Sequence, residues 1–100
     1  MNLKDKSITT LVEKVLNKFT SQNIKIEDYW DADLCAIGFT GDHEGYLVYV
    51  STDGKNENEY FVSLEVPSIE NDAPYETKAN YEKVTYPELE KLIFEHLISR

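Results

Sequence analysis

The fold is decided by two runs of sequence separated by a polar connection: Gly45-Tyr46-Leu47-Val48-Tyr49-Val50-Ser51 and Tyr60-Phe61-Val62-Ser63-Leu64-Glu65-Val66-Pro67. Both runs are rich in β-branched and aromatic residues, which favour strands. Between them lies Asp53-Gly54 within an Asn- and Glu-rich segment. This arrangement predicts a β-hairpin.

The register of this hairpin follows from the requirement to bury one apolar face. A tight turn on Asp53-Gly54 would place Val48 opposite Glu59 and Val50 opposite Glu57. A wider loop keeps one face apolar, because it pairs Val50 with Tyr60, Val48 with Val62 and Tyr46 with Leu64. We predict the wider loop, since a slip of one residue would turn every side chain to the other face.

The second face of the hairpin would carry Leu47, Tyr49 and Phe61. If two helices cover the first face, these side chains form an exposed patch that would bind a partner. If one helix lies on each side of the sheet, they belong to an ordinary core. The sequence leaves both arrangements open.

The segments outside the hairpin predict an α+β fold in a single domain spanning residues 1–100. Apolar residues at helical spacing predict a first helix over Ser7–Phe19, with Ser7 as its N-cap. Thr85 and Glu88 have the spacing of a capping box, and Pro87 suits a first turn, so a second helix follows. Its buried stripe is predicted to contain Leu89, Leu92, Ile93, His96 and Leu97.

The remaining strands are predicted to complete an antiparallel meander of four to five strands. Alternation predicts a short edge strand over Ile24–Trp30, and an apolar run predicts a strand over Leu34–Thr40 with a bulge or close approach at Gly38. Residues 68–80 lack periodicity and are predicted to be irregular, with a short fifth strand over Tyr81–Thr85. Short connections favour antiparallel neighbours.

The charge of the chain is strongly negative and unevenly distributed. Ten basic and nineteen acidic residues give a net charge of −9, and residues 1–25 contribute +3 while residues 26–100 contribute −12. Such a surface suits a basic protein partner, because complementary charge speeds encounter. Direct binding of nucleic acid is disfavoured, since it requires clustered Lys and Arg.

Cysteine usage and hydropathy indicate a cytoplasmic protein. The single Cys35 excludes an intramolecular disulfide and suits a reducing compartment. No run has the length of a membrane span, and the N-terminus lacks the apolar core of a signal peptide. We therefore expect no membrane association.

The sequence offers no catalytic motif, so we do not expect an enzyme, a metal or another cofactor. His96 falls on the apolar stripe of the last helix and is interpreted as a packed histidine. His43 lies between Asp42 and Glu44 in a polar turn. The acidic segment after Asp53 lacks the spacing of a calcium loop and is interpreted as a hairpin loop.

Three acidic segments are the candidate partner-binding surfaces. Aromatic residues embedded among acids can anchor an interface while the charges dock basic groups. A solvated turn and a simple connector are the competing interpretations. The candidate residues are Asp28, Trp30, Asp31 and Asp33 in the first segment, Asp42 and Glu44 in the second, and Glu70, Asp72, Tyr75 and Glu76 in the third.

The overall pattern resembles the immunity proteins of bacterial polymorphic toxin systems, including contact-dependent growth inhibition. The residues behind this resemblance are Gly45-Tyr46-Leu47-Val48-Tyr49-Val50, Tyr60-Phe61-Val62 and Tyr86-Pro87-Glu88-Leu89-Glu90-Lys91-Leu92. The resemblance implies a cytoplasmic antitoxin that binds one toxin domain, often a basic nuclease, and blocks its action. We expect a monomer or a weak homodimer.

Two other functions remain open at this stage. A secretion-chaperone-like domain would hold an extended client on the Leu47/Tyr49/Phe61 face or in a helix groove. An acidic mimic of nucleic acid would block a nucleic-acid enzyme, and it shares the charge argument with the immunity interpretation.

Overall fold

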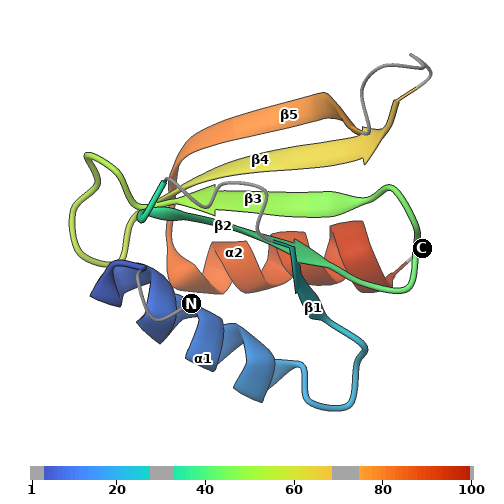
Figure 1. Ribbon diagram of the computed structural model, residues 1–100, viewed down its shortest axis with the longest axis horizontal. Coiled ribbons are helices and arrows are strands. Elements are labelled where there is room, and N and C mark those ends of the chain that lie inside the picture. The colour runs from blue at the N-terminus through green and yellow to red at the C-terminus, as the bar shows by residue number, and fades with distance from the viewer. Residues whose placement is uncertain (1–3, 28–32, 69–74, 100) are drawn as a thin grey trace.

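Both helices pack on the same face of one antiparallel sheet in the computed structural model, which describes residues 4–27, 33–68 and 75–99 (Figure 1). The five strands are hydrogen-bonded in chain order, as a meander. The predicted α+β architecture is therefore confirmed. Its elements are α1 Lys6–Lys18, β1 Lys25–Glu27, β2 Ala36–Thr40, β3 Leu47–Ser51, β4 Tyr60–Pro67, β5 Tyr75–Val84, α2 Tyr86–Ile93 and the π-helical turn η1 Phe94–Ile98.

The central hairpin has its predicted faces but a different register. Val50 is opposite Val62 and Val48 is opposite Leu64, a shift of two residues from the predicted pairing. A two-residue shift leaves the apolar face unchanged, so burial alone could not distinguish the two registers. Tyr60 instead pairs with Val84 of β5, where both side chains are buried.

The two helices close the core over this face. One stripe of α1 is buried, and the apolar side of α2 and η1 packs beside it on the same face of the sheet (Figure 1). The buried residues of the helices are Ile8, Leu11, Val12, Val15, Phe19, Leu89, Ile93, His96 and Leu97, with Leu92 partly buried. This agrees with the predicted stripes.

The cap of α1 differs from the prediction, whereas the cap of α2 agrees with it. Asp5 is the N-cap of α1, and its carboxylate accepts a hydrogen bond from the backbone N–H of Ser7 at 3.0 Å. Ser7, predicted to be the cap, lies within the helix because an aspartate two residues earlier supplies the acceptor. The Thr85–Glu88 capping box is present, with Pro87 in the first turn.

The longest strand lies where the sequence predicts an irregular segment. β5 begins at Tyr75 and runs for ten residues, so both the predicted loop over residues 75–80 and the short strand after it are corrected. Pairing with β4 is shifted between Tyr60 and Val62 and between Leu64 and Glu65. These shifts interrupt the two-residue alternation that identifies a strand in sequence.

The other edge of the sheet is regular. Gly38 pairs with both Glu27 and Tyr49 in ladders without a register shift, so the predicted bulge at Gly38 is wrong. Within the predicted strand over residues 24–30, β1 occupies Lys25–Glu27, and residues 28–30 lie outside the described part of the chain.

The second face of the sheet has no helix over it, yet it is not an exposed aromatic patch. Leu47 is fully buried, and Tyr49 and Phe61 are half-buried. The two rings meet edge to face with centroids 6.1 Å apart. Among the described residues, no helix has the length and hydropathy required to cross a membrane.

Candidate interaction site

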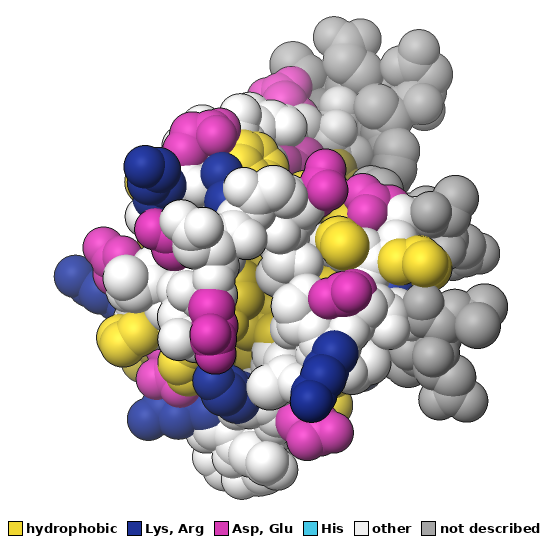
Figure 2. Space-filling model, turned by 90° about the vertical axis from the view of Figure 1, so that its left-hand side faces the viewer, with side chains coloured by type: hydrophobic (Ala, Val, Ile, Leu, Met, Phe, Trp, Pro, Cys, Tyr) yellow, Lys and Arg dark blue, Asp and Glu magenta, His cyan; other side chains and the backbone are white. Residues whose placement is uncertain are grey.

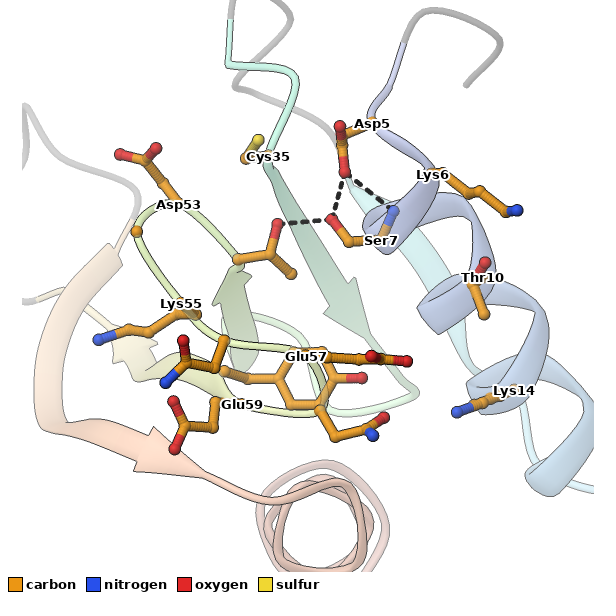
Figure 3. Close-up of a pocket in the computed structure, with 15 residues that line it drawn as sticks. Asp5, Lys6, Ser7, Thr10, Lys14, Cys35, Asp53, Lys55, Glu57 and Glu59 are labelled. Carbon is orange, nitrogen blue, oxygen red and sulfur yellow. Dashed lines mark hydrogen bonds between the residues drawn. The ribbon is translucent and has the colours of Figure 1, made fainter.

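A cleft lies between the start of α1 and the loop that joins β3 to β4, residues 52–59. Its volume is about 610 Å³. Figure 2 looks onto this end of the molecule, where hydrophobic atoms are visible at the base of a hollow and both acidic and basic side chains lie around it. Cys35 and Tyr60 line the cleft together with the two polar walls (Figure 3). We call it the α1–loop cleft.

A chain of hydrogen bonds fixes the α1 wall of the cleft to the sheet. The Ser7 hydroxyl donates to the Asp5 carboxylate at 2.6 Å, and it lies 2.7 Å from the Thr52 hydroxyl (Figure 3). Because the Ser7 proton is already donated to Asp5, the Thr52 hydroxyl donates to Ser7. The two hydrogen bonds from Ser7 lower the pKa of Asp5 below its usual value. These contacts hold the first turn of α1 against the end of β3.

The floor of the cleft is joined to the same network. The backbone N–H of Thr52 donates to the carbonyl of Cys35 at 2.9 Å. The N–H of Asp5 donates to the carbonyl of Leu34 at 2.8 Å, and the Lys4 ammonium donates to the carbonyl of Asp33 at 2.7 Å. The start of β2, the end of β3 and the start of α1 therefore form one connected frame.

The two walls of the cleft carry opposite charge. The loop wall contains the acidic residues Asp53, Glu57 and Glu59, of which Glu57 points toward α1 and Asp53 points away from it (Figure 3). The α1 wall contains Lys6 and Lys14 together with the N-cap Asp5. Lys55 also belongs to the loop, but its ammonium lies 3.6 Å from the Glu82 carboxylate of β5 and its side chain is only 17% exposed. The loop wall is therefore strongly acidic on its solvent side.

The acidic field of this end extends to the open face of the sheet. Burial raises the pKa of Tyr49, and the neighbouring carboxylates of Asp33 and Asp53 raise it further, against a hydrogen bond with Ser51 that lowers it. Negative charge disfavours the phenolate form. Asp33 and Asp53 thus lie close enough to Tyr49 for their negative charge to raise the pKa of its phenol.

The structure divides the predicted partner-binding residues between opposite ends of the sheet. Asp33 lies at the end that holds the α1–loop cleft. Asp42, Glu44, Tyr75 and Glu76 lie at the other end, where the β2–β3 turn meets the start of β5 (Figure 1). Five further predicted residues lie outside the described residues, namely Asp28, Trp30, Asp31, Glu70 and Asp72.

At this second end, tight packing joins two segments that are distant in sequence. Gly45 has a φ of +87°, and a Cβ atom there would lie 2.5 Å from Cγ of Pro67. Pro67 is paired in turn with Tyr75. The side-chain amide of Asn23 donates to the Asp42 carboxylate at 2.6 Å, which also fixes the turn to the segment after α1. Glu44 and Glu76 are exposed there.

Three acids of the α1–loop cleft are missing from the sequence-based candidates. In the sequence, Asp53, Glu57 and Glu59 belong to an acidic segment that lacks the spacing of a calcium loop and is interpreted as a hairpin loop. The signal that would identify them is topological, because successive connections of a meander alternate between the two ends of a sheet. The loop after β3 must therefore lie at the same end as Asp33.

His96 has a structural position, and the described metal-ligating side chains are dispersed. His96 is buried and donates from Nε2 to the backbone carbonyl of Glu65, so it holds the last helical turn against the sheet. Its ring contacts Tyr46, with centroids 5.5 Å apart. Within residues 4–27, 33–68 and 75–99, no three metal-ligating side chains are grouped together.

Comparison of the chain with protein-family models, with curated proteins and with solved structures gives no match.

Proposed function

We propose that this chain is an immunity-type inhibitor that acts in the cytoplasm and neutralises a basic bacterial toxin domain through the end of the sheet that holds the α1–loop cleft. The observation that carries the proposal is the group of acids Asp53, Glu57 and Glu59 on the loop wall of a cleft that Cys35 and Tyr60 also line. An inhibitor needs a rigid scaffold and a complementary surface, and it needs no catalytic group.

The geometry suits capture of a basic side chain or loop. A lysine or arginine of the partner could place its charged end against the loop wall while its aliphatic part packs on Cys35 and Tyr60. The frame between α1, β2 and β3 is already hydrogen-bonded, so little ordering would be needed on binding. The net charge of −9 would attract such a partner from a distance.

The structure gives less support to the chaperone-like alternative. Of the two client sites expected for that function, the Leu47/Tyr49/Phe61 face is not an exposed patch, because Leu47 is fully buried and the two aromatic rings are half-buried against each other. This observation does not bear on the other expected site, a helix groove.

The test compares two triple variants with equal changes in net charge. The first variant replaces the loop wall, with Asp53→Asn, Glu57→Gln and Glu59→Gln. The second replaces the acids at the other end, with Asp42→Asn, Glu44→Gln and Glu76→Gln. Both raise the net charge by three, so a difference between them reports where the partner binds rather than the total charge.

The partner is first captured from lysate and secreted fractions of the source cell, and its toxicity is then assayed with and without the chain. Association of the purified pair is measured at low and high salt. We expect the loop-wall variant to associate about tenfold more slowly at low salt and to lose most of its salt dependence. A slower rate in the second variant alone would move the site to the other end, and a partner whose toxicity is unchanged would overturn the inhibitor function.

A further inference from the structure

β5 is a long strand with an unpaired outer edge. It is the last strand of the sheet, and within the described residues no strand lies on its outer side (Figure 1). Its ten residues contrast with the three residues of β1 at the opposite edge. Most of its side chains are exposed, including Tyr81 at 41%. An exposed edge of this length can pair with another strand.

The edge of β5 differs from the rest of the surface in charge. Glu76 and Glu82 are balanced by Lys78 and Lys83, so the strand is neutral in a chain of net charge −9. A basic partner would find no net attraction along this edge. Two copies of the chain would repel each other least where their neutral strands meet.

The sequence of β5 is also complementary to itself when it is placed antiparallel about a twofold axis at Asn80. Lys78 and Glu82 lie at the two ends of the regular segment of residues 79–81, where β5 bulges against β4. In this register Lys78 of each copy would face Glu82 of the other, so two pairs of opposite charge would form. Ala79 lies opposite Tyr81. Both of these residues are on the helix side of the sheet, because they pair with Leu64 and Val62 of β4.

Neighbouring twofold registers are less favourable. A twofold axis at Ala79 would place Glu76 opposite Glu82 in both halves, where like charges repel. A twofold axis at Tyr81 would leave Lys78 opposite Val84 and bring Asn80 opposite Glu82. Among these three, the register at Asn80 alone forms pairs of opposite charge.

The surface beside the edge can accept the second copy. A groove of about 500 Å³ runs between β5 and α2, and it is lined by Tyr81, Val84 and Leu92 together with charged residues. In the Asn80 register the two Tyr81 rings are diagonal neighbours across the twofold axis, within reach of each other. The exposed ring of each copy would then cover apolar surface next to the groove.

We propose that two copies of this chain associate edge to edge through β5, in the register centred on Asn80, to form a continuous ten-stranded sheet with the helices of both copies on one side. The register shifts that flank residues 79–81 limit the length of regular pairing, so the association is weak. The proposal does not rest on the inhibitor function, because the α1–loop cleft is lined by neither Asn80 nor Tyr81. The two surfaces are linked through the Lys55–Glu82 ion pair.

The sharpest test uses two single variants, Lys78→Glu and Glu82→Lys. Each variant alone would place like charges opposite each other twice, and we expect dimerisation of each to weaken about tenfold. When the two variants are mixed, the two glutamates of the Lys78→Glu chain face the two lysines of the Glu82→Lys chain. A heterodimer should therefore form with nearly the affinity of the unchanged chain. Sedimentation velocity from micromolar to millimolar concentration measures all four cases.

Glu82 also faces Lys55 within its own chain, so Glu82→Lys requires a control. Lys55→Gln removes that ion pair without changing the proposed interface, and we expect it to dimerise normally. Circular dichroism checks that each variant is folded.

A second measurement locates the twofold axis. In a chain carrying Cys35→Ser and Asn80→Cys, the new thiol would lie opposite its own copy and form an intermolecular disulfide under mild oxidation. Cys35→Ser with Lys83→Cys is the matched control, because residue 83 faces Thr77 and not itself, so little disulfide should form.

Several results would overturn the proposal. The proposal is wrong if the chain stays monomeric up to millimolar concentration. Dimerisation that is equally strong in both charge variants, or that is not restored on mixing them, would assign the dimer to another surface. Pairing of β5 with a strand of a different protein, in place of a second copy, would also contradict it.

Discussion

The Nε2 atom of His96 lies 2.7 Å from the backbone carbonyl oxygen of Glu65, and the two residues join the last helical turn to β4. A carbonyl oxygen can only accept, so Nε2 carries the proton. The imidazole is 2% exposed, and its ring also contacts Tyr46. This histidine therefore has a structural role in the core.

Replacing His96 with Ala should lower the free energy of unfolding by about 2–4 kcal/mol, because it removes a buried hydrogen bond and leaves a cavity. Urea denaturation followed by circular dichroism measures the change. His96→Gln is the matched variant, since its amide can still donate, and it should lose less. Equal losses in the two variants would contradict a role for the hydrogen bond.

Gly45 and Gly54 provide a pair of substitutions that separates backbone strain from packing. Both residues have positive φ, +87° and +70°, so alanine is strained at either position. A Cβ at Gly45 would collide with Pro67, whereas a Cβ at Gly54 would meet nothing within 4 Å. We expect Gly54→Ala to cost about 1 kcal/mol of stability and Gly45→Ala clearly more.

The comparison can be completed by relieving the collision. A Cβ at Gly45 would meet both Cγ and Cβ of Pro67, at 2.5 and 2.9 Å, so only glycine at position 67 removes both contacts. In the double variant Gly45→Ala with Pro67→Gly, the loss of stability beyond that of Pro67→Gly should therefore fall to the cost of the positive φ alone. Thermal unfolding of the four chains gives the coupling between the two positions. Additive losses would show that Pro67 does not limit this site.

The capping box of α2 predicts a loss of stability in acid. Hydrogen bonds from Thr85 lower the pKa of Glu88 below its usual value of 4.5. Because the folded-state pKa is the lower one, the stabilisation is present above pH 4.5 and is lost as the pH falls through the folded-state value. Glu88→Gln should unfold with a flatter pH dependence between pH 5 and pH 2, which is about the range of carboxyl titration.

The matched control for this experiment is Glu95→Gln, which also removes one carboxylate from the same helical segment, away from the first turn. The melting temperature of each variant is recorded as a function of pH. If both variants follow the pH dependence of the unchanged chain, the carboxylate of Glu88 does not contribute through its cap.

Tyr86 predicts a loss of stability in alkali, whereas Glu88 predicts a loss of stability in acid. Burial raises the pKa of its phenol, and the nearby Glu90 carboxylate raises it further. The hydroxyl is buried and forms no hydrogen bond of normal geometry within the described residues, but the Glu90 carboxylate is near enough to attract its proton and so to favour the neutral phenol. Stability from this difference is present below about pH 10 and is lost as the pH rises toward the folded-state value.

Tyr86→Phe removes this buried hydroxyl and should raise the free energy of unfolding at pH 7 by up to about 1 kcal/mol. It should also reduce the loss of stability above pH 10, the usual range of phenol ionisation. Tyr81→Phe is the control, because its ring is 41% exposed and the change should have little effect. A large loss of stability in Tyr86→Phe would reveal a hydrogen bond to the hydroxyl.

The features that the sequence predicts correctly arise from local patterns. Each of these features is encoded by residues that are close together in the chain. They are the apolar stripe from Ile8 to Val15, the Thr85–Glu88 capping box and the alternating strands on either side of residues 52–59. Helical spacing, capping and alternation act on neighbours in the chain, so they can be recognised before the fold is known.

The candidate site was predicted only in part for a related reason. Asp33 lies beside the α1–loop cleft, but Asp42, Glu44, Tyr75 and Glu76 are carried to the opposite end of the sheet. Their residue types made them candidates, whereas their positions follow from the alternation of turns in a meander. The same alternation brings Asp53, Glu57 and Glu59 to the end where Asp33 lies.

The sequence by itself thus determined two amphipathic helices, a central hairpin with one apolar face, an α+β fold and an acidic chain. The tertiary structure decided the hairpin register, the length of β5 and the position of both helices on one face. A shift of two residues preserves each face, and two register shifts hide the alternation of β5. These choices depend on contacts between segments distant in the chain, which no local pattern records.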